Sequence, residues 1–191
     1  MKTTQRKDQI ISVASQLFKE KGYNAVSMRD IADALDMKAA SLYNHIKGKQ
    51  EILSTLILRV ASEFTEGMKS VVNERSGSLQ KIEKIIGIHI DITIANSEAL
   101  AALNNDWMHL EGVDLTTFIR MREDYESNFR RIIKQGIAEG AIRPLHPEVI
   151  LFSILSTLRT LYLWYERHDD LDISTLKKDT LEVLIKGIVK N

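Results

Sequence analysis

The chain contains no cysteine, and this absence excludes several kinds of site at once. Without thiols there is no disulfide framework, no thiolate nucleophile and no sulfur-ligated metal, a composition that a reducing compartment favours. The sequence also lacks any apolar run near the roughly 20 residues that a membrane-spanning helix needs. Its polar start, MKTTQRKDQ, is not followed by the apolar core of a signal peptide. We therefore predict a cytoplasmic protein with no membrane partner.

Residues that interrupt helices are also scarce, with two prolines and nine glycines among 191 residues. Apolar residues recur at intervals of three and four almost everywhere, which is the spacing of an amphipathic helix. The alternation of apolar and polar residues that is typical of strands is absent. We therefore predict an all-α fold of about nine helices.

Local capping signals set the boundaries of these predicted helices. A first helix over residues 5–21 stops at Gly22, because glycine readily adopts the left-handed backbone conformation that closes a helix. Ser27 opens a short second helix, and Asp30 completes a capping box with it. The other helices are expected at 38–45, at 48–74, and from Ser78, Ser97, Asp114, Pro147 and Ser174 onward.

Charge of one sign is not in excess, because 26 basic residues balance 26 acidic ones. The distribution is uneven, however. Residues 1–50 hold nine Lys or Arg against five Asp or Glu, a net charge of +4, and the rest of the chain carries −4. Contacts with phosphates supply most non-specific affinity for DNA, so this asymmetry is suggestive of a DNA-facing module on an acidic body.

Residues 27–46, SMRDIADALDMKAASLYNHI, form two short amphipathic segments on either side of a turn. The apolar positions of these segments are Met28, Ile31, Ala32, Leu35, Met37 and Leu42. The second segment would expose hydrogen-bonding groups and small methyls on Lys38, Ala39, Ser41, Tyr43 and Asn44. Such a surface suits the major groove of DNA. An ordinary helical hairpin with a solvated polar face remains the alternative.

The segment SMRDIADALDMKAASLYNHIKGKQEIL resembles the N-terminal DNA-binding module of the TetR family of transcriptional regulators. This resemblance implies a helix-turn-helix, with phosphate contacts from Ser27, Tyr43, His45 and Lys49. It implies that Lys38, Ala39, Ser41 and Asn44 lie nearest the bases. Asn44 is the expected reader of an adenine, because its amide both donates and accepts hydrogen bonds.

Two positions depart from the family pattern. Asp36 stands where the family usually has glycine in the turn, and Ile46 stands where it usually has phenylalanine. Aspartate tolerates the left-handed backbone region better than most residues, so we expect the turn to survive. Ile46 is expected to keep the apolar anchor.

The resemblance divides the chain into a helix-turn-helix DNA-binding domain over residues 1–47 and an effector-binding and dimerisation domain over 48–191. It implies a transcriptional repressor that a small-molecule effector releases from a palindromic operator. The segment RMREDYESNFRRIIKQGIAEGAIRP is also similar to a branch that controls fatty-acid or sterol degradation and senses acyl-CoA thioesters. We therefore expect an acyl-CoA-like or hydrophobic effector.

Two predicted C-terminal helices are apolar on nearly every side, and such helices must be covered on every side. The resemblance implies a four-helix dimer interface formed by the helix at 147–168 and the one after it, around a two-fold axis. Burial within one subunit is the alternative. The expected interface residues are Phe152, Leu155, Leu158, Tyr162, Trp164, Tyr165, Leu181, Leu184 and Ile188.

Methionine and aromatic residues in the middle of the chain suit an adaptable apolar cavity for the effector. The candidates are Phe64, Met68, His89, Thr93, Trp107, Met108, His109, Phe118, Met121, Arg122 and Tyr125. A packed core is the alternative for each of them, and for His89 a buried, hydrogen-bonded imidazole. Arg122 could meet an anionic group such as a CoA phosphate, and the alternative for it is a solvated helix face that pairs with Glu123 and Glu126.

Enzyme motifs and metal-ligand spacings are missing from the sequence. There is no glycine-rich phosphate loop, no serine-centred nucleophile elbow and no Glu-x-x-His pair. The polar set around Asn104, Asp106 and His109 matches no standard metal motif. We therefore predict no enzymatic activity, no cofactor and no metal site.

Overall fold

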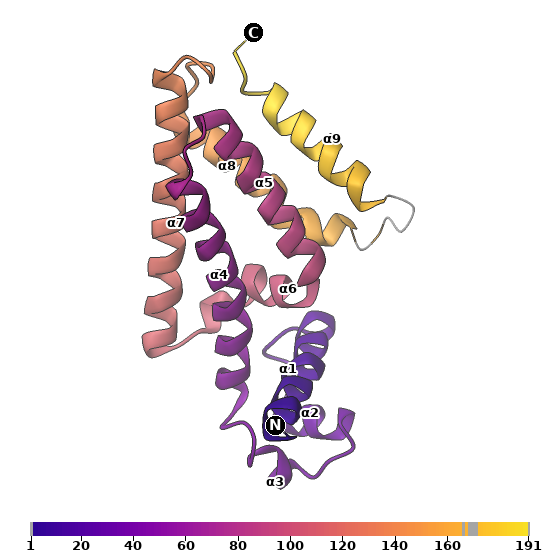
Figure 1. Cartoon of the computed structure of the whole chain (residues 1–191). Helices are drawn as coiled ribbons and strands as arrows, with labels where there is room; N and C mark the ends of the chain where they lie inside the picture. Colours follow the sequence, from indigo (N-terminus) through magenta and orange to yellow (C-terminus); the bar gives the residue numbers. More distant parts are fainter. Residues whose placement is uncertain (1, 166, 168–171, 191) are drawn as a thin grey trace. The chain divides into compact units, whose positions relative to one another are not determined.

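The computed structural model describes residues 2–165, 167 and 172–190, and α-helices dominate these ranges (Figure 1). The helical segments fall into two compact units. The N-terminal unit comprises Met1–Ala61 and Asn96–Ile119, and the C-terminal unit comprises Ser62–Ala95 and Arg120–Asn191. Within the described ranges the β-structure is one isolated bridge between Ile142 and Val189. The predicted all-α class is therefore confirmed.

The N-terminal unit is built around the first helix. Helix α1 packs against both α2 and α6, and α2 packs against α3. The helices of this unit are α1 (Lys2–Lys21), α2 (Met28–Ala34), α3 (Ala39–Leu42), the first part of α4 (Lys49–Asn73), α6 (Ser97–Asn105), the 3₁₀ helix η1 (Trp107–His109) and the start of α7 (Gly112–Ala138). Residues far along the chain therefore complete the core of the amino-terminal module.

Local interactions at the helix ends match the expectations from sequence. Gly22 closes α1 with a φ of 82°. The Ser27 side chain accepts a hydrogen bond from the Asp30 amide, and the Ser27 amide donates to the Asp30 carboxylate over 2.7 Å, which forms the predicted capping box. Asp36 lies in the left-handed region with a φ of 51°. The turn between α2 and α3 is therefore made without glycine.

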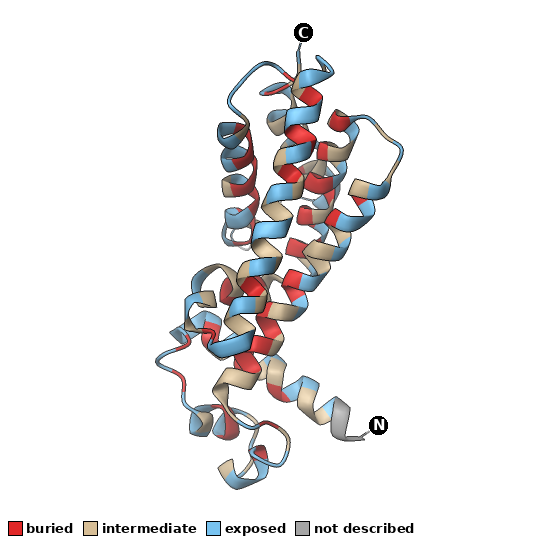
Figure 2. Cartoon of the chain, turned by 90° about the vertical axis from the view of Figure 1, so that its left-hand side faces the viewer, coloured by how far each residue is buried: buried red, intermediate tan, exposed pale blue. Residues whose placement is uncertain are grey.

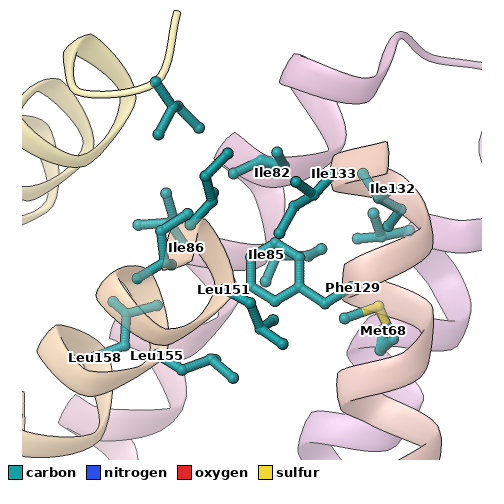
Figure 3. Close-up of a cluster of buried hydrophobic side chains, with 14 of the residues drawn as sticks. Met68, Ile82, Ile85, Ile86, Phe129, Ile132, Ile133, Leu151, Leu155 and Leu158 are labelled. Carbon is teal, nitrogen blue, oxygen red and sulfur yellow. The ribbon is translucent and has the colours of Figure 1, made fainter. Parts of the chain in front are cut away.

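The C-terminal unit has its own apolar core. It contains the remainder of α4 and α7 together with α5 (Ser78–Ala95), α8 (Pro147–Tyr165) and α9 (Ile173–Lys186). Helix α5 packs against both α8 and α9. Figure 3 shows Phe129 of α7 surrounded by isoleucines and leucines from α5, α7 and α8. The buried residues recur along one side of each helix, as the colouring in Figure 2 shows.

Close packing in this unit depends on one glycine of α7. A Cβ atom on Gly136 would lie 2.5 Å from Cδ1 of Ile142 and 2.9 Å from Cβ of Ser78. These distances are shorter than a van der Waals contact, so a larger residue would push the neighbouring segments apart. The chain accordingly has its smallest residue where α7, α5 and the turn after α7 meet.

Several predicted boundaries differ from those observed. Helix α3 has four residues rather than the range 38–45, and residues 43–45 continue as hydrogen-bonded turns. The start predicted at Asp114 lies at Gly112. Helix α8 ends at Tyr165, and part of the predicted continuation to residue 168 lies outside the described residues. The two compact units also divide α4 and α7, whereas the sequence suggested a single boundary after residue 47.

No single helix among the described residues is both long and apolar enough to span a membrane. The consecutive helices α5 and α6 reach that length and composition only as a pair.

Candidate functional site

The segment around α3 presents a polar surface on an apolar anchor. The side chains of Leu42 and Ile46 are buried, so the segment is fixed to the N-terminal unit at two points. Lys38, Ser41 and Asn44 are exposed, and Tyr43 is 54% exposed. The structure therefore turns toward solvent the hydrogen-bonding side chains that the sequence predicted to face DNA. The departure at Ile46 keeps the anchor, as expected.

The remaining residues of the predicted DNA-binding set are partly engaged within the subunit. Ala39, His45 and Lys49 are half-buried, whereas Ser27 is exposed. The Ser27 hydroxyl donates to the Asp30 carboxylate over 2.6 Å, so its first role is to cap α2. Hydrogen bonds from Ser27 also lower the pKa of Asp30, which keeps this carboxyl ionised.

Lys49 has three partners at the turn between α1 and α2. Its ammonium donates to the carbonyl oxygen of Tyr23 over 2.7 Å and to that of Val26 over 2.8 Å. The same nitrogen lies 4.2 Å from the centre of the Tyr23 ring, in a cation–π contact. Burial lowers the pKa of Lys49, partly offset by the charge of Asp106. The structure thus uses this predicted phosphate ligand to tie the first residue of α4 to the α1–α2 turn.

A second contact holds the start of α4 to α1. Glu51 accepts a hydrogen bond from the Lys7 ammonium over 2.5 Å and another from the Lys47 amide over 2.7 Å. These bonds lower the pKa of Glu51, with the Lys7 bond as the larger cause. Charged side chains therefore fix the chain on both sides of α2 and α3. Lys49 binds the α1–α2 turn, and Glu51 binds α1 and the residues before α4.

The η1 segment adds a further set of contacts to the same region. The rings of His109 and Tyr23 are stacked, with 5.4 Å between their centroids. Nε2 of His109 lies 3.3 Å from Nδ2 of Asn24, and Gln50 donates to the carbonyl oxygen of His109 over 2.7 Å. The Tyr23 amide donates to the carboxyl group of Asp106, whose pKa is raised by burial. The sequence pattern did not reveal these contacts, because their partners are far apart in the chain.

A buried polar pair lies in the C-terminal unit. Nε2 of His89 on α5 is 2.6 Å from the hydroxyl oxygen of Tyr125 on α7. The Phe64 ring lies 4.4 Å from the imidazole between centroids, and Thr93 donates to the His89 carbonyl oxygen over 2.7 Å. Four predicted effector contacts from three helices are therefore close together.

Both members of this pair are uncharged at neutral pH. Burial lowers the pKa of His89 to about 3, and the positive charge of Arg159 adds to this effect. Burial also raises the pKa of the Tyr125 hydroxyl. The pair can therefore hydrogen-bond to a neutral polar group, and it offers no charge to an anion.

The depressed pKa of His89 predicts a loss of stability in mild acid. Its imidazole has the ordinary pKa of 6.5 when unfolded and a pKa of about 3 when folded. Between these values the unfolded chain binds more protons, so the free energy of unfolding falls as the pH drops below 6.5. The slope is at most about 1.4 kcal/mol per pH unit. Urea unfolding at pH 7, 6 and 5 measures it.

A His89→Gln variant should lose most of this dependence on pH, because glutamine does not titrate. The matched control is His146→Gln, which removes an exposed histidine of the same unit. An unchanged slope in His89→Gln would contradict the buried, neutral state of this imidazole.

The other predicted effector contacts are distributed over both units. Met68 belongs to the apolar core of the C-terminal unit, while Met108 is 63% exposed. The rings of Trp107 and Phe118 pack together in the N-terminal unit, with 5.6 Å between centroids. Phe64, Met68, His89, Thr93, Met121, Arg122 and Tyr125 lie in the C-terminal unit, and Trp107, Met108, His109 and Phe118 lie in the N-terminal unit. His109 contacts the α1–α2 turn there, a role that the sequence did not suggest.

The predicted dimer-interface residues differ in exposure. Leu155, Leu158, Tyr162 and Ile188 are buried within the subunit, so they are not available to a partner. The reason is that α5 covers this side of α8 and also packs against α9. Phe152 is 71% exposed and Trp164 is 43% exposed, whereas Tyr165, Leu181 and Leu184 are half-buried.

Other exposed apolar residues extend this surface. Val149 and Leu163 share one side of α8 with Phe152 and Trp164, by the 100° spacing of helical residues, and Val183 is exposed on α9.

Among the residues that the structure describes, no three His, Asp or Glu side chains gather in a way that could hold a metal ion.

Two family models match the sequence. The family described as bacterial regulatory proteins, tetR family, matches residues 10–56. The family described as tetracyclin repressor-like, C-terminal domain, matches residues 76–188. The first of these covers most of α1, all of α2 and α3, and the start of α4, and the second begins two residues before α5 and ends after α9.

Similar proteins match along almost the whole chain. The HTH-type transcriptional repressor KstR2 of Rhodococcus jostii is 20% identical over 185 residues, which are 96% of this chain and 91% of that protein. The structure of the ketosteroid transcriptional regulator KstR2 of Mycobacterium tuberculosis has a TM-score of 0.91 at 20% identity, covering 97% of this chain and 96% of that one. AibR in complex with isovaleryl coenzyme A and operator DNA has a TM-score of 0.80 at 24% identity, covering 94% and 98%. At these identities the structural likenesses show a shared fold.

Proposed function

Because this chain belongs to the tetR family of bacterial regulatory proteins, we propose that it is a repressor that binds a palindromic operator as a homodimer. An acyl-CoA-like or hydrophobic effector releases it. Membership of this family makes the chain a transcriptional regulator rather than an enzyme. A bacterial regulator works on the chromosome, so the cytoplasm is its proposed location.

The exposed polar surface of the α3 segment carries this proposal. Lys38, Ser41 and Asn44 face solvent next to Tyr43, while Leu42 and Ile46 hold the segment in place. In our proposal Lys38, Ala39, Ser41 and Asn44 approach the bases, and Asn44 reads an adenine. A fixed, polar segment of this size fits the major groove, where each base pair presents a distinct set of donors and acceptors.

Phosphate contacts come from the residues around this segment. In our proposal Ser27, Tyr43 and His45 bind phosphates on the two sides of the groove. Lys49 supports them through its bonds to the α1–α2 turn, because its ammonium already has two carbonyl acceptors. Phosphate contacts orient the protein on the duplex and do not read its sequence.

The exposed apolar side of α8 supports a two-fold dimer. Phe152 and Trp164 lie there with Val149 and Leu163, and small residues such as Ser156 stand between them. Large apolar side chains on one side of a helix favour burial against a partner. A two-fold assembly presents α3 twice, as a palindromic operator requires.

The His89–Tyr125 pair is the proposed contact for the acyl part of the effector. Both side chains are neutral and half-buried or buried, next to the Phe64 ring. A neutral hydrogen-bonding pair suits a carbonyl or thioester oxygen better than a free carboxylate, which would be desolvated without a counter-charge. Isovaleryl coenzyme A in the AibR complex supports a CoA thioester as the class of effector.

The test is binding to a labelled duplex from the region upstream of the protein's own coding sequence. The affinity should fall steeply as the salt concentration rises, because phosphate contacts release counterions. Isovaleryl-CoA or palmitoyl-CoA should lower the affinity by about 5- to 150-fold, which corresponds to a coupling of about 1–3 kcal/mol. Free isovalerate and palmitate are the matched controls. Stronger operator binding with the thioester would overturn the proposed direction of regulation.

A further inference from the structure

We propose that His109 and Asp106 are positioning residues for operator binding, and that they hold the segment α2–α3 at both of its ends. His109 lies in η1 and Asp106 directly precedes it, in the part of the chain that the sequence assigns to effector binding. The structure places that segment in the same compact unit as α2 and α3. The inference rests on the proposed operator binding. It adds the contacts within the N-terminal unit that fix the orientation of the proposed DNA-binding surface.

At its first end the α2–α3 segment connects to α1 through the turn between α1 and α2. The His109 ring stacks on Tyr23, and its Nε2 lies 3.3 Å from the amide nitrogen of the Asn24 side chain. The carboxyl group of Asp106 accepts a hydrogen bond from the Tyr23 backbone amide. Asp106 and His109 therefore hold Tyr23 and Asn24, two consecutive residues before α2, by one ring contact and two polar contacts.

The second end is the start of α4, which follows α3. Gln50 donates from its side chain to the carbonyl oxygen of His109 over 2.7 Å. Lys49, its neighbour, lies over the ring of Tyr23 and donates to the carbonyl oxygen of the same residue. His109 consequently contacts the turn before the α2–α3 segment through its side chain and the first turn of α4, after that segment, through its carbonyl oxygen.

The segment between these connections is anchored by the buried side chains of Ile31, Ala32, Leu42 and Ile46, which lie on two very short helices and the turn that follows them. Helix α3 has four residues and buries only Leu42, and α2 has seven residues and buries Ile31 and Ala32. Helices this short are not stable alone and take their orientation from their contacts. A loss of the side-chain contacts at the α1–α2 turn would therefore change the orientation of the exposed surface more than it would change the core of the unit.

The test compares His109→Ala with Met108→Ala. Met108 is the neighbouring residue of η1, and its side chain is 63% exposed, so its removal serves as the matched control. His109→Ala should weaken binding to the upstream duplex by about 5- to 100-fold, as expected for the loss of one stacked ring and one hydrogen bond. Met108→Ala should bind like the parent. Equal affinities for the two variants would overturn the proposal.

The salt dependence separates positioning from direct contact with DNA. A residue that binds no phosphate leaves the slope of log affinity against log salt unchanged, whereas the loss of a cationic phosphate contact reduces it by about one. The slope of His109→Ala should therefore equal that of the parent. A slope reduced by about one would make His109 a phosphate ligand and overturn the positioning role.

Hydrogen exchange of the free protein provides a readout that does not depend on finding the operator. Amides of residues 27–46 should exchange about 5- to 100-fold faster in His109→Ala than in Met108→Ala, and those of α8 should be unchanged. Asp106→Asn keeps an oxygen that can accept from the Tyr23 amide and should exchange like the parent, while Asp106→Ala should not. Equal exchange in all four variants would overturn the inference even if operator binding itself is established.

Discussion

The Tyr43→Ala variant is expected to bind operator DNA about two to four orders of magnitude more weakly than the parent. Tyr43 follows α3 and is 54% exposed, whereas the nearby Leu42 and Ile46 are buried. A hydrogen bond to a charged group contributes about 1.5–3 kcal/mol, and a two-fold complex makes the contact twice. Because Tyr43 contributes little to the core, the helical content should not change.

Fluorescence anisotropy with a labelled duplex measures this loss, and circular dichroism verifies the helical content. Tyr43→Phe is the matched variant, since it removes the hydroxyl and keeps the ring. If the hydroxyl binds phosphate, Tyr43→Phe should lose most of the same affinity. An alanine variant that binds like the parent would remove Tyr43 from the DNA-binding surface. A loss of helical content would instead make Tyr43 a structural residue.

The Phe152→Asp variant is expected to be monomeric at concentrations where the parent is a dimer. Phe152 is 71% exposed in the single chain, so the substitution leaves the core of the subunit intact. Burying a phenylalanine contributes about 1.5–3 kcal/mol, and an interface with two-fold symmetry contains it twice. An aspartate at the same place adds the cost of burying an unpaired charge. Dimerisation should therefore weaken by at least about two to four orders of magnitude.

Light scattering or native mass spectrometry gives the mass of each variant. Trp164→Asp, on the same side of α8, should behave in the same way, because Trp164 is 43% exposed. Val113→Asp is the matched control, since Val113 is 77% exposed and lies outside α8 and α9. A Phe152→Asp protein that remains dimeric, with the mass of the control, would refute this interface. Monomers should also bind a palindromic duplex more weakly, because only one α3 engages it at a time.

Features that depend on a few neighbouring residues were predicted correctly from the sequence. The capping box of Ser27 and Asp30, the closure of α1 at Gly22 and the left-handed backbone at Asp36 all form as expected. The starts of α5, α6 and α8 also lie at the predicted residues. Each of these features is decided within about one helical turn, by a side chain that bonds to the nearby backbone or by a backbone that tolerates a positive φ.

The polar surface of α3 could also be predicted, and its apolar anchors were part of the same pattern. The spacing of Leu42 and Ile46 implies a buried side, and the exposed side then follows from helical geometry. The family match confirms the TetR resemblance and with it the all-helical class. The contacts of these residues with DNA remain predictions.

Contacts between residues far apart in the chain could not be predicted from the sequence. An apolar residue on α8 can be buried by its own subunit or by a partner, and its sequence neighbours are the same in both cases. Leu155, Leu158 and Tyr162 are covered within the subunit, while Phe152 is exposed. The contacts of His109 with Tyr23, Asn24 and Gln50 were likewise not indicated by its sequence neighbours.

The sequence by itself determined the helical class, the capped helix ends and the exposed polar side of α3, because these depend on short-range spacing and local hydrogen bonds. Only the tertiary structure decided which apolar side chains are left exposed, that Lys49 is bound to the α1–α2 turn and that η1 contacts that turn. These contacts join residues up to 85 positions apart. Their formation depends on how whole helices pack, and no local pattern of residues encodes that arrangement.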